Sequence, residues 1–156
     1  MRDDVFEKGE WIDFVETEDP YEWEDYTPLD FVIPEDIKRI GERAFERCHC
    51  LTSIVIPDSV TSIGERAFED CNSLKSITIP EGVTCIEDRT FSGCTNLRNV
   101  CLPDSLVSIG NGAFRSCFSI ETIVIPKGVK RIGDGAFSES CLTSITIPEG
   151  VTNIGD

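Results

Sequence analysis

The chain has 156 residues and a formal net charge of −15, from 14 Lys and Arg against 29 Asp and Glu. That length suits one ordinary domain, and the charge argues against direct binding to a nucleic-acid backbone, which needs clustered cations. No run of 18 apolar residues is present, which argues against a membrane span. Because the chain has one histidine, a multi-histidine metal site is disfavoured. We expect no catalytic site, metal or cofactor.

The first 27 residues differ in composition from the rest. They contain eleven acidic and two basic residues, and they hold both tryptophans and both tyrosines of the chain, Trp11, Tyr21, Trp23 and Tyr26. The shift predicts a boundary near Pro28, between an acidic aromatic segment (1–27) and a second domain (28–156). No apolar core of a signal peptide is visible in this segment, so the compartment stays open.

Two roles are open for residues 1–27. Residues 11–15, Trp-Ile-Asp-Phe-Val, alternate like a strand and could pair with the first unit of the second domain, as a cap. Residues 16–27 mix acids with aromatic side chains, a pattern typical of an interaction tail that docks on a partner. We keep Trp11, Tyr21, Trp23 and Tyr26 as candidate binding residues of such a tail.

From residue 28 the chain is a repeat. Prolines that follow an aliphatic residue recur at steps of 23, 23, 23, 23 and 22 residues: Pro34, Pro57, Pro80, Pro103, Pro126 and Pro148. The repeat therefore divides the domain into five coils and a partial sixth, at 28–50, 51–73, 74–96, 97–119, 120–141 and 142–156.

Each coil begins with a strand pattern. Apolar residues stand three residues and one residue before the proline, as Ile77 and Ile79 do in Ser76-Ile77-Thr78-Ile79. This period of two is typical of a half-buried strand, and the proline ends it because proline cannot donate to a sheet. The outward positions of coils 2–6 form what we call the outward strip, our candidate binding surface: Ser53, Val55, Ser76, Thr78, Asn99, Cys101, Thr122, Val124, Ser144 and Thr146.

The second half of the coil has its own pattern. A short alternation of Val and Ile usually ends in glycine, and Ala-Phe and Cys follow, as in Ala67-Phe68 and Cys71. We expect this last part to form a short helical or 3₁₀ turn. In coil 3 the glycine is replaced by Glu87, so either the position tolerates a side chain or a left-handed backbone is strained there.

Stacking the coils explains the repeat. One coil of 23 residues cannot bury its own apolar face, but coils spaced by about 4.8 Å bury each Ile, Phe and Cys against its equivalent in the next coil. The sequence therefore predicts a solenoid of short β-strands with short helical turns. Repeat arrays need caps, and none is visible after coil 6, so the chain could be a fragment of a longer array or could associate end to end.

The cysteines and the arginines have simple structural interpretations. Equivalent cysteines at Cys48, Cys71, Cys94 and Cys117 predict a buried thiol ladder, whereas Cys85 and Cys101 occupy outward positions and are expected to be exposed. The Cys48-His49-Cys50 triplet lacks the further ligands of a tetrahedral metal site. Three arginines in register, flanked by acids, fit either a solvated face or a recognition stripe: Arg43, Arg66 and Arg89.

The unit Leu-x-x-Ile-x-Ile-Pro-x-x-Val-x-x-Ile-Gly-x-x-Ala-Phe-x-x-Cys resembles the BspA-like class of leucine-rich repeat over residues 28–156. The resemblance implies a right-handed solenoid with the outward strip on its concave side. It also implies a function of the adhesion or surface-recognition kind, since members of the class are often cell-surface proteins that bind other proteins.

The leading hypothesis is a non-enzymatic protein–protein interaction module whose partner is another protein. One alternative is an acidic inhibitor that mimics nucleic acid and acts on a basic intracellular protein. Another is an N-terminal piece of a longer structural repeat array.

Overall fold

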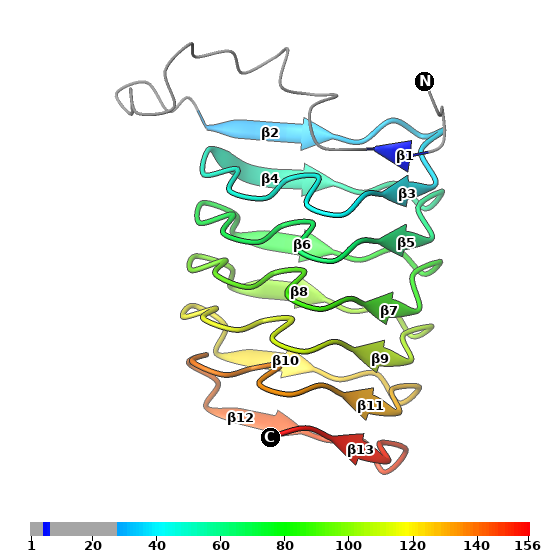
Figure 1. Ribbon diagram of the computed structural model, residues 1–156, viewed down its shortest axis with the longest axis vertical. Coiled ribbons are helices and arrows are strands. Elements are labelled where there is room, and N and C mark those ends of the chain that lie inside the picture. Colours follow the sequence, from blue (N-terminus) through cyan, green and yellow to red (C-terminus); the bar gives the residue numbers. More distant parts are fainter. Residues whose placement is uncertain (1–4, 7–27) are drawn as a thin grey trace.

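The computed structural model describes residues 5–6 and 28–156. Its strands stand in two columns, and every pair that hydrogen-bonds within a column is parallel (Figure 1). The first column contains β2 (Leu29–Val32), β4 (Leu51–Val55), β6 (Ser76–Thr78), β8 (Asn99–Cys101), β10 (Thr122–Val124) and β12 (Ser144–Thr146). The second contains β1 (Val5–Phe6), β3 (Arg39–Ile40), β5 (Ser62–Ile63), β7 (Cys85–Ile86), β9 (Ser108–Ile109), β11 (Arg131–Ile132) and β13 (Asn153–Ile154).

Strand pairing follows the repeat. Ile77 of β6 lies opposite Val100 of β8, one period of 23 residues away, and Ile132 of β11 lies opposite Ile109 of β9. Equivalent residues therefore stack, as the sequence pattern predicts for a solenoid. The predicted fold class is confirmed.

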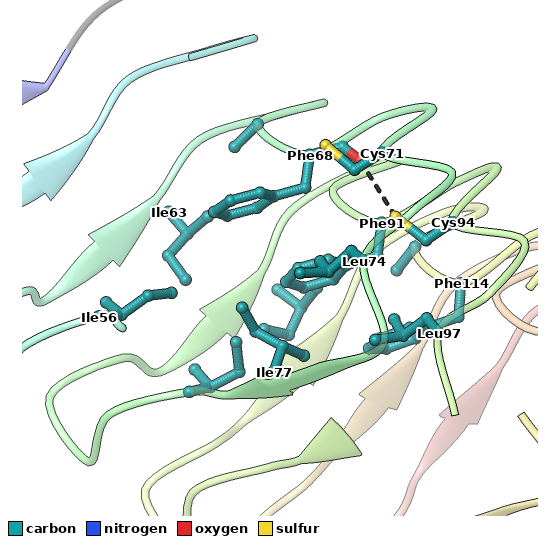
Figure 2. Packing of buried hydrophobic residues seen from close by; sticks show 14 of the residues in the cluster. Ile56, Ile63, Phe68, Cys71, Leu74, Ile77, Phe91, Cys94, Leu97 and Phe114 are labelled. Carbon is teal, nitrogen blue, oxygen red and sulfur yellow. Dashed lines mark hydrogen bonds between the residues drawn. The ribbon is translucent and has the colours of Figure 1, made fainter. Parts of the chain in front are cut away.

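Aromatic rings form the middle of the core (Figure 2). Phe68 and Phe91 stack with their centroids 5.3 Å apart and their planes within 7°, and Phe91 and Phe114 repeat this contact at 5.4 Å. Each of these three rings is fully buried. The phenylalanine of the repeat thus supplies one ring from each of coils 1–5 to a continuous stack.

The predicted thiol ladder is present beside the rings. Cys48, Cys71, Cys94 and Cys117 are all buried and unbridged. The thiol of Cys71 donates to the carbonyl oxygen of Phe45 at 3.0 Å, and Cys117 does the same to Phe91 at 3.2 Å. The thiols of Cys71 and Cys117 are therefore each tied to the backbone of the preceding coil.

The turn that carries Ala-Phe is not helical in the described residues, contrary to our expectation. In coil 2, Arg66 and Asp70 have φ values of 55° and 60°, and a right-handed helix cannot pass through them. The backbone N–H of Phe68 donates to Thr90 of the next coil at 2.9 Å rather than within its own turn. Bonds between coils therefore alternate with bonds inside the turn, where Glu69 donates to Arg66 at 3.1 Å and Cys71 donates to Phe68 at 3.2 Å.

The glycine position is explained by close packing between coils. A Cβ on Gly64 would lie 2.6 Å from the backbone nitrogen of Glu42 in the preceding coil. The left-handed residues of coil 3 are Arg89 and Gly93, not Glu87. Glu87 therefore does not adopt the left-handed backbone that would strain it, and of our two alternatives the tolerated side chain is the one that holds.

The N-terminal part contributes one short strand. Val5 and Phe6 pair with Arg39 and Ile40 of β3, in the second column. The strand that we predicted at residues 11–15 lies outside the described residues. β1 therefore adds one parallel strand to the second column on the N-terminal side of coil 1.

Candidate functional site

The outward strip follows the first column of strands. Thr122 and Val124 of β10 lie opposite Ser144 and Thr146 of β12. In the same way Ser76 lies opposite Asn99 in the pair β6–β8. Because alternate residues of a strand point to opposite faces, the ten strip residues share one face, as the sequence predicts.

This face is accessible and weakly polar. Val124 is 83% exposed and Val55 is 57% exposed, and Thr78 and Cys101 between them are exposed as well. Two rows run along the strip: a row of Val, Thr and Cys, and a row of Ser, Asn and Thr. Exposed valines beside small hydroxyls leave room for a partner's larger side chains.

One end of the strip is tied by hydrogen bonds. Ser53 donates to Oδ1 of Asp30 at 2.6 Å, and Thr52 donates to the same oxygen at 2.8 Å. These bonds, with the Ser53 bond first, lower the pKa of the Asp30 carboxyl. The carboxylate of Asp30 in coil 1 therefore places a negative charge next to the first residues of the strip, and the hydroxyl of Ser53 is already hydrogen-bonded.

Acidic residues border the strip on the side of the turns. The first residue after each proline is exposed and, except at Lys127, acidic: Glu35, Asp58, Glu81, Asp104 and Glu149. Glu81 accepts the N–H groups of Asp104 and Ser105, both at 3.3 Å. The acidic border favours a partner with basic groups at its edge.

A hollow of about 590 Å³ lies at the C-terminal part of the strip. Val124 and Thr146 of the strip line it together with inward and turn residues: Ile123, Ile125, Lys127, Pro148, Glu149 and Gly150. Its walls are mainly apolar, with Lys127 and Glu149 as charged groups. The repeat pattern did not reveal this hollow, because it forms between two coils and not within one.

Thiols at the outward positions differ from each other. Cys101 is exposed as predicted. Cys85 is half-buried and accepts a hydrogen bond from the Ser108 hydroxyl at 3.0 Å, so its predicted exposure was wrong. Burial is the main cause that raises the pKa of Cys85, which leaves it a poor nucleophile at neutral pH.

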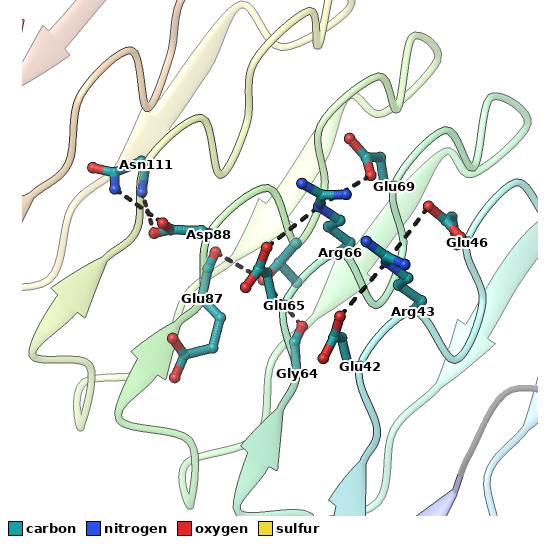
Figure 3. A network of polar contacts seen from close by, with 11 residues as sticks. Glu42, Arg43, Glu46, Gly64, Glu65, Arg66, Glu69, Glu87, Asp88 and Asn111 are labelled. Atoms are coloured by element: carbon teal, nitrogen blue, oxygen red, sulfur yellow. Dashed lines mark hydrogen bonds and ion pairs between the residues drawn. The ribbon is translucent and has the colours of Figure 1, made fainter.

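Two arginines of the row, Arg43 and Arg66, form ion pairs with neighbouring glutamates (Figure 3). Nε of Arg43 lies 3.6 Å from Glu42 and 3.9 Å from Glu46, and Arg66 repeats this arrangement with its own two glutamates. In the next coil, Asn111 donates to both carboxylate oxygens of Asp88, at 2.7 and 2.9 Å. Arg43 and Arg66 are thus paired with glutamates of their own coils, although the Nε atom of each is buried and makes no hydrogen bond among the described residues.

The other predicted site residues need only brief description. The ring of His49 is hydrogen-bonded to Asn72 at 3.2 Å, and Cys48 belongs to the buried ladder. No cluster of three metal-ligating side chains, and no helix able to cross a membrane, is found among the residues that the structure describes. The four aromatic candidates Trp11, Tyr21, Trp23 and Tyr26 lie outside them.

Comparison with known proteins agrees with the geometry. Residues 38–156 match the family model of the BspA type leucine-rich repeat region, in six copies. None of the curated proteins compared matches the chain.

Several solved structures are similar. A leucine-rich repeat protein from Bacteroides ovatus is 40% identical with a TM-score of 0.70, over 83% of this chain and 34% of that one. A leucine-rich cell surface protein from Faecalibacterium prausnitzii is 45% identical with a TM-score of 0.67, over 79% and 31%. A leucine-rich repeat protein from T. pallidum is 30% identical with a TM-score of 0.75, over 82% and 69%. The chain thus spans about a third of the length of the first two.

Proposed function

Because the chain belongs to the BspA-type leucine-rich repeat family, we propose that it is a non-enzymatic module that binds another protein through the outward strip. The observation that carries the proposal is the exposed row of small side chains that leads into the apolar hollow beside Val124 and Thr146. A hollow bordered by a flat polar surface suits a partner that inserts one apolar side chain and lays extended backbone beside it.

The proposed role is of the adhesion or surface-recognition kind. One similar structure is described as a leucine-rich cell surface protein, and that description concerns the F. prausnitzii protein. The acidic border of the strip adds a preference for a partner that carries Lys or Arg beside its apolar anchor. Such a border speeds association with a basic partner at low salt.

The test is a pull-down with the tagged full chain, followed by mass spectrometry, on two matched variants. Val124→Asp places a charge in the strip at the hollow, and Val107→Asp places the same charge on an exposed valine next to β9 in the second column. We expect the partner to be recovered with the wild type and with Val107→Asp, and to be lost with Val124→Asp.

Equal recovery with both variants would place recognition elsewhere and overturn the assignment to the strip. Repeated failure of the intact chain to recover any partner would overturn the binding function itself. Circular dichroism of both variants controls for loss of fold.

Residues 1–27 are proposed as a separate segment, either a cap or an interaction tail. A chain that lacks these residues, run in the same pull-down, separates the roles. Loss of the partner on deletion, while Val124→Asp retains it, assigns recognition to the acidic aromatic segment with Trp11, Tyr21, Trp23 and Tyr26. Retention on deletion assigns it to the solenoid.

The net charge of −15 favours a second candidate, an acidic inhibitor that mimics nucleic acid and occupies a basic protein. Residues 1–27 contribute −9 of this net charge, from eleven acidic and two basic residues. An electrostatic mimic loses affinity steeply as salt screens its charges. Partner binding that is unchanged across a wide range of salt concentration would reject this candidate and leave the apolar strip as the binding surface.

A further inference from the structure

Charged side chains border the outward strip on both sides in coils 3–5. In each of these coils one charged residue precedes the strip residues and another follows the proline. All six are exposed, and they form three pairs: Lys75 and Glu81, Arg98 and Asp104, Glu121 and Lys127. Their strands, β6, β8 and β10, follow one another along the first column (Figure 1). In coils 2 and 6 the residue before the strip is uncharged, Thr52 and Thr143, so only coils 3–5 of the strip are charged on both borders.

The sign of the charge changes along each border. On the side where the strands begin, coils 3 and 4 are basic and coil 5 is acidic, and on the side where the strands end, coils 3 and 4 are acidic and coil 5 is basic. Each of the three coils thus carries opposite charges across the strip, and coil 5 carries them in the opposite sense. A partner that complements coils 3 and 4 meets two repulsive contacts at coil 5 unless its own charges reverse there as well.

Stability of the stack does not account for this order. The backbone N–H of Arg98 donates to the carbonyl oxygen of Lys75 at 2.9 Å, so these two bases are direct neighbours. Glu81 accepts the backbone N–H of Asp104 at 3.3 Å, so these two acids are neighbours as well. Like charges opposite each other on neighbouring strands are destabilising, and only the step from coil 4 to coil 5 brings opposite charges together along a border. The arrangement therefore costs the isolated chain free energy that contact with a complementary partner would offset.

The six border side chains are not engaged in ion pairs. None of them forms an ion pair with another side chain in residues 28–156. Arginines of the turns differ in this respect, since Arg66 lies 3.3 Å from Glu65 and Arg115 lies 3.1 Å from Glu139. Charges that are exposed and unpaired in the isolated chain are available to pair with a partner.

The spacing of the borders fits an extended segment that lies along the stack. Coils about 4.8 Å apart place the charges of coils 3 and 5 on one border about 10 Å apart. An extended chain points its side chains alternately to its two sides, with successive residues of one side about 6.8 Å apart. Over three coils the mismatch is about 2 Å at each end, which flexible Lys and Glu side chains absorb. The backbone of the segment then lies over the small strip residues of β6, β8 and β10.

We propose that coils 3–5 of the outward strip bind an extended segment of a partner protein whose charges are acidic, acidic and basic along one side and basic, basic and acidic along the other. The inference rests on the proposed binding function and adds to it the charge order of the partner. Because coil 5 reverses the sign, the segment satisfies all six charged contacts in one direction only. A uniformly basic segment would face repulsion from Lys75, Arg98 and Lys127.

The probes are two synthetic peptides with blocked ends, the same composition and zero net charge. The matching peptide, Glu-Lys-Glu-Lys-Lys-Glu, places Glu, Glu and Lys on one side and Lys, Lys and Glu on the other. The regular peptide, Glu-Lys-Glu-Lys-Glu-Lys, complements coils 3 and 4 but meets like charges at coil 5. Titration of the isotope-labelled full chain at low salt, followed by NMR, measures both affinities and locates the contact through the amide signals of Ser76, Asn99 and Thr122. We expect the wild type to bind the matching peptide at least about threefold more tightly.

Two variants that leave the net charge unchanged test the charge order itself. Glu121→Lys combined with Lys127→Glu gives coil 5 the same polarity as coils 3 and 4, and we expect this variant to prefer the regular peptide by a similar factor. Glu87→Lys combined with Lys130→Glu exchanges two exposed charges next to β7 and β11 in the second column. We expect this control variant to keep the preference of the wild type.

Four results would overturn the proposal: no binding of either peptide, equal affinity of the wild type for both, an unchanged preference after the exchange in coil 5, or amide shifts confined to the second column. The comparison of the two peptides on the wild type needs no variant, and the dispersion of the NMR spectrum shows whether each variant keeps its fold. Equal peptide affinities, together with loss of the captured partner in Val124→Asp, would reject the charge order alone and retain binding at the strip.

Discussion

The thiol of Cys94 donates a 3.2 Å hydrogen bond to the carbonyl oxygen of Phe68, 26 residues earlier in the chain. That carbonyl also accepts the backbone N–H of Cys71 at 3.2 Å. The thiol therefore connects two coils at a point where the backbone of the turn is already bonded within its own coil. The cysteine of the repeat serves both as an apolar side chain and as a donor between coils.

Replacement of this thiol should be costly. We expect Cys94→Ala to lower the free energy of unfolding by about 1–3 kcal/mol, because it removes a hydrogen bond and leaves a small cavity. Cys94→Ser keeps a donor and should lose less. Urea unfolding measures both, with Cys141→Ala, at an exposed thiol, as the control. Equal stability of Cys94→Ala and the control would show that the hydrogen bond contributes nothing.

The thiols should divide into two classes of reactivity. Burial is the first cause that raises the pKa of Cys94 well above its ordinary value, and that of Cys50 is raised by burial as well. Cys101 and Cys141 are exposed. We expect iodoacetamide to label Cys101 and Cys141 first in the folded chain, and Cys94 only in urea. Early labelling of Cys94, read by peptide mass spectrometry, would contradict the buried ladder.

Alkaline pH should destabilise the solenoid through Cys117. Burial raises the pKa of this thiol from 9.0 to about 12. The folded chain therefore holds this proton more tightly than the unfolded chain does. Below about pH 9 the thiol is protonated in both the folded and the unfolded chain, and stability does not depend on its ionisation. Between about pH 9 and pH 12 only the unfolded chain loses the proton, so the free energy of unfolding falls by about 1.4 kcal/mol per pH unit. Urea unfolding across this range should give a shallower pH slope for Cys117→Ala, and an identical slope would refute the assignment.

The ring stack should be strongest in its middle. Phe91 is fully buried between Phe68 and Phe114, so Phe91→Ala should cost about 3–5 kcal/mol. Phe137 stacks on one ring only in the described residues, at 5.5 Å, and is half-buried. Phe137→Ala should therefore cost clearly less in thermal or urea unfolding. The reverse order would mean that the stack is not the main contribution of these rings.

Close packing between coils should make Gly64 intolerant of a side chain. A Cβ there meets the backbone of Glu42 at 2.6 Å, whereas on Gly82 it would meet the carbonyl of Val60 at 3.1 Å. We expect Gly64→Ala to lower the free energy of unfolding by about 1–3 kcal/mol, and Gly82→Ala to lower it less. If Gly64→Ala is as stable as the wild type, the backbone of the preceding coil accommodates a Cβ at this point and the close approach to Glu42 is not a constraint on stability.

Much of the architecture follows from the period of the sequence. Prolines 23 residues apart place Ile54, Ile77 and Val100 on one face of successive strands, so the inward ladders and the outward strip could be predicted from spacing alone. The backbone conformation of the turns could not be predicted from this spacing. Hydrogen bonds between coils compete there with bonds within the turn, and the non-helical result depends on Arg66 and Asp70 at positive φ.

The sequence by itself determined the solenoid, the buried rings and thiols, and the residues of the outward strip, because in a repeat each side chain packs on its own equivalent one period away. The tertiary structure alone decided what departs from that rule. The Cys94 thiol reaches a carbonyl 26 residues back, which requires the actual offset between coils. The hollow beside Val124 and the half-burial of Cys85 depend on how neighbouring coils fit together, and a period carries no information about that fit.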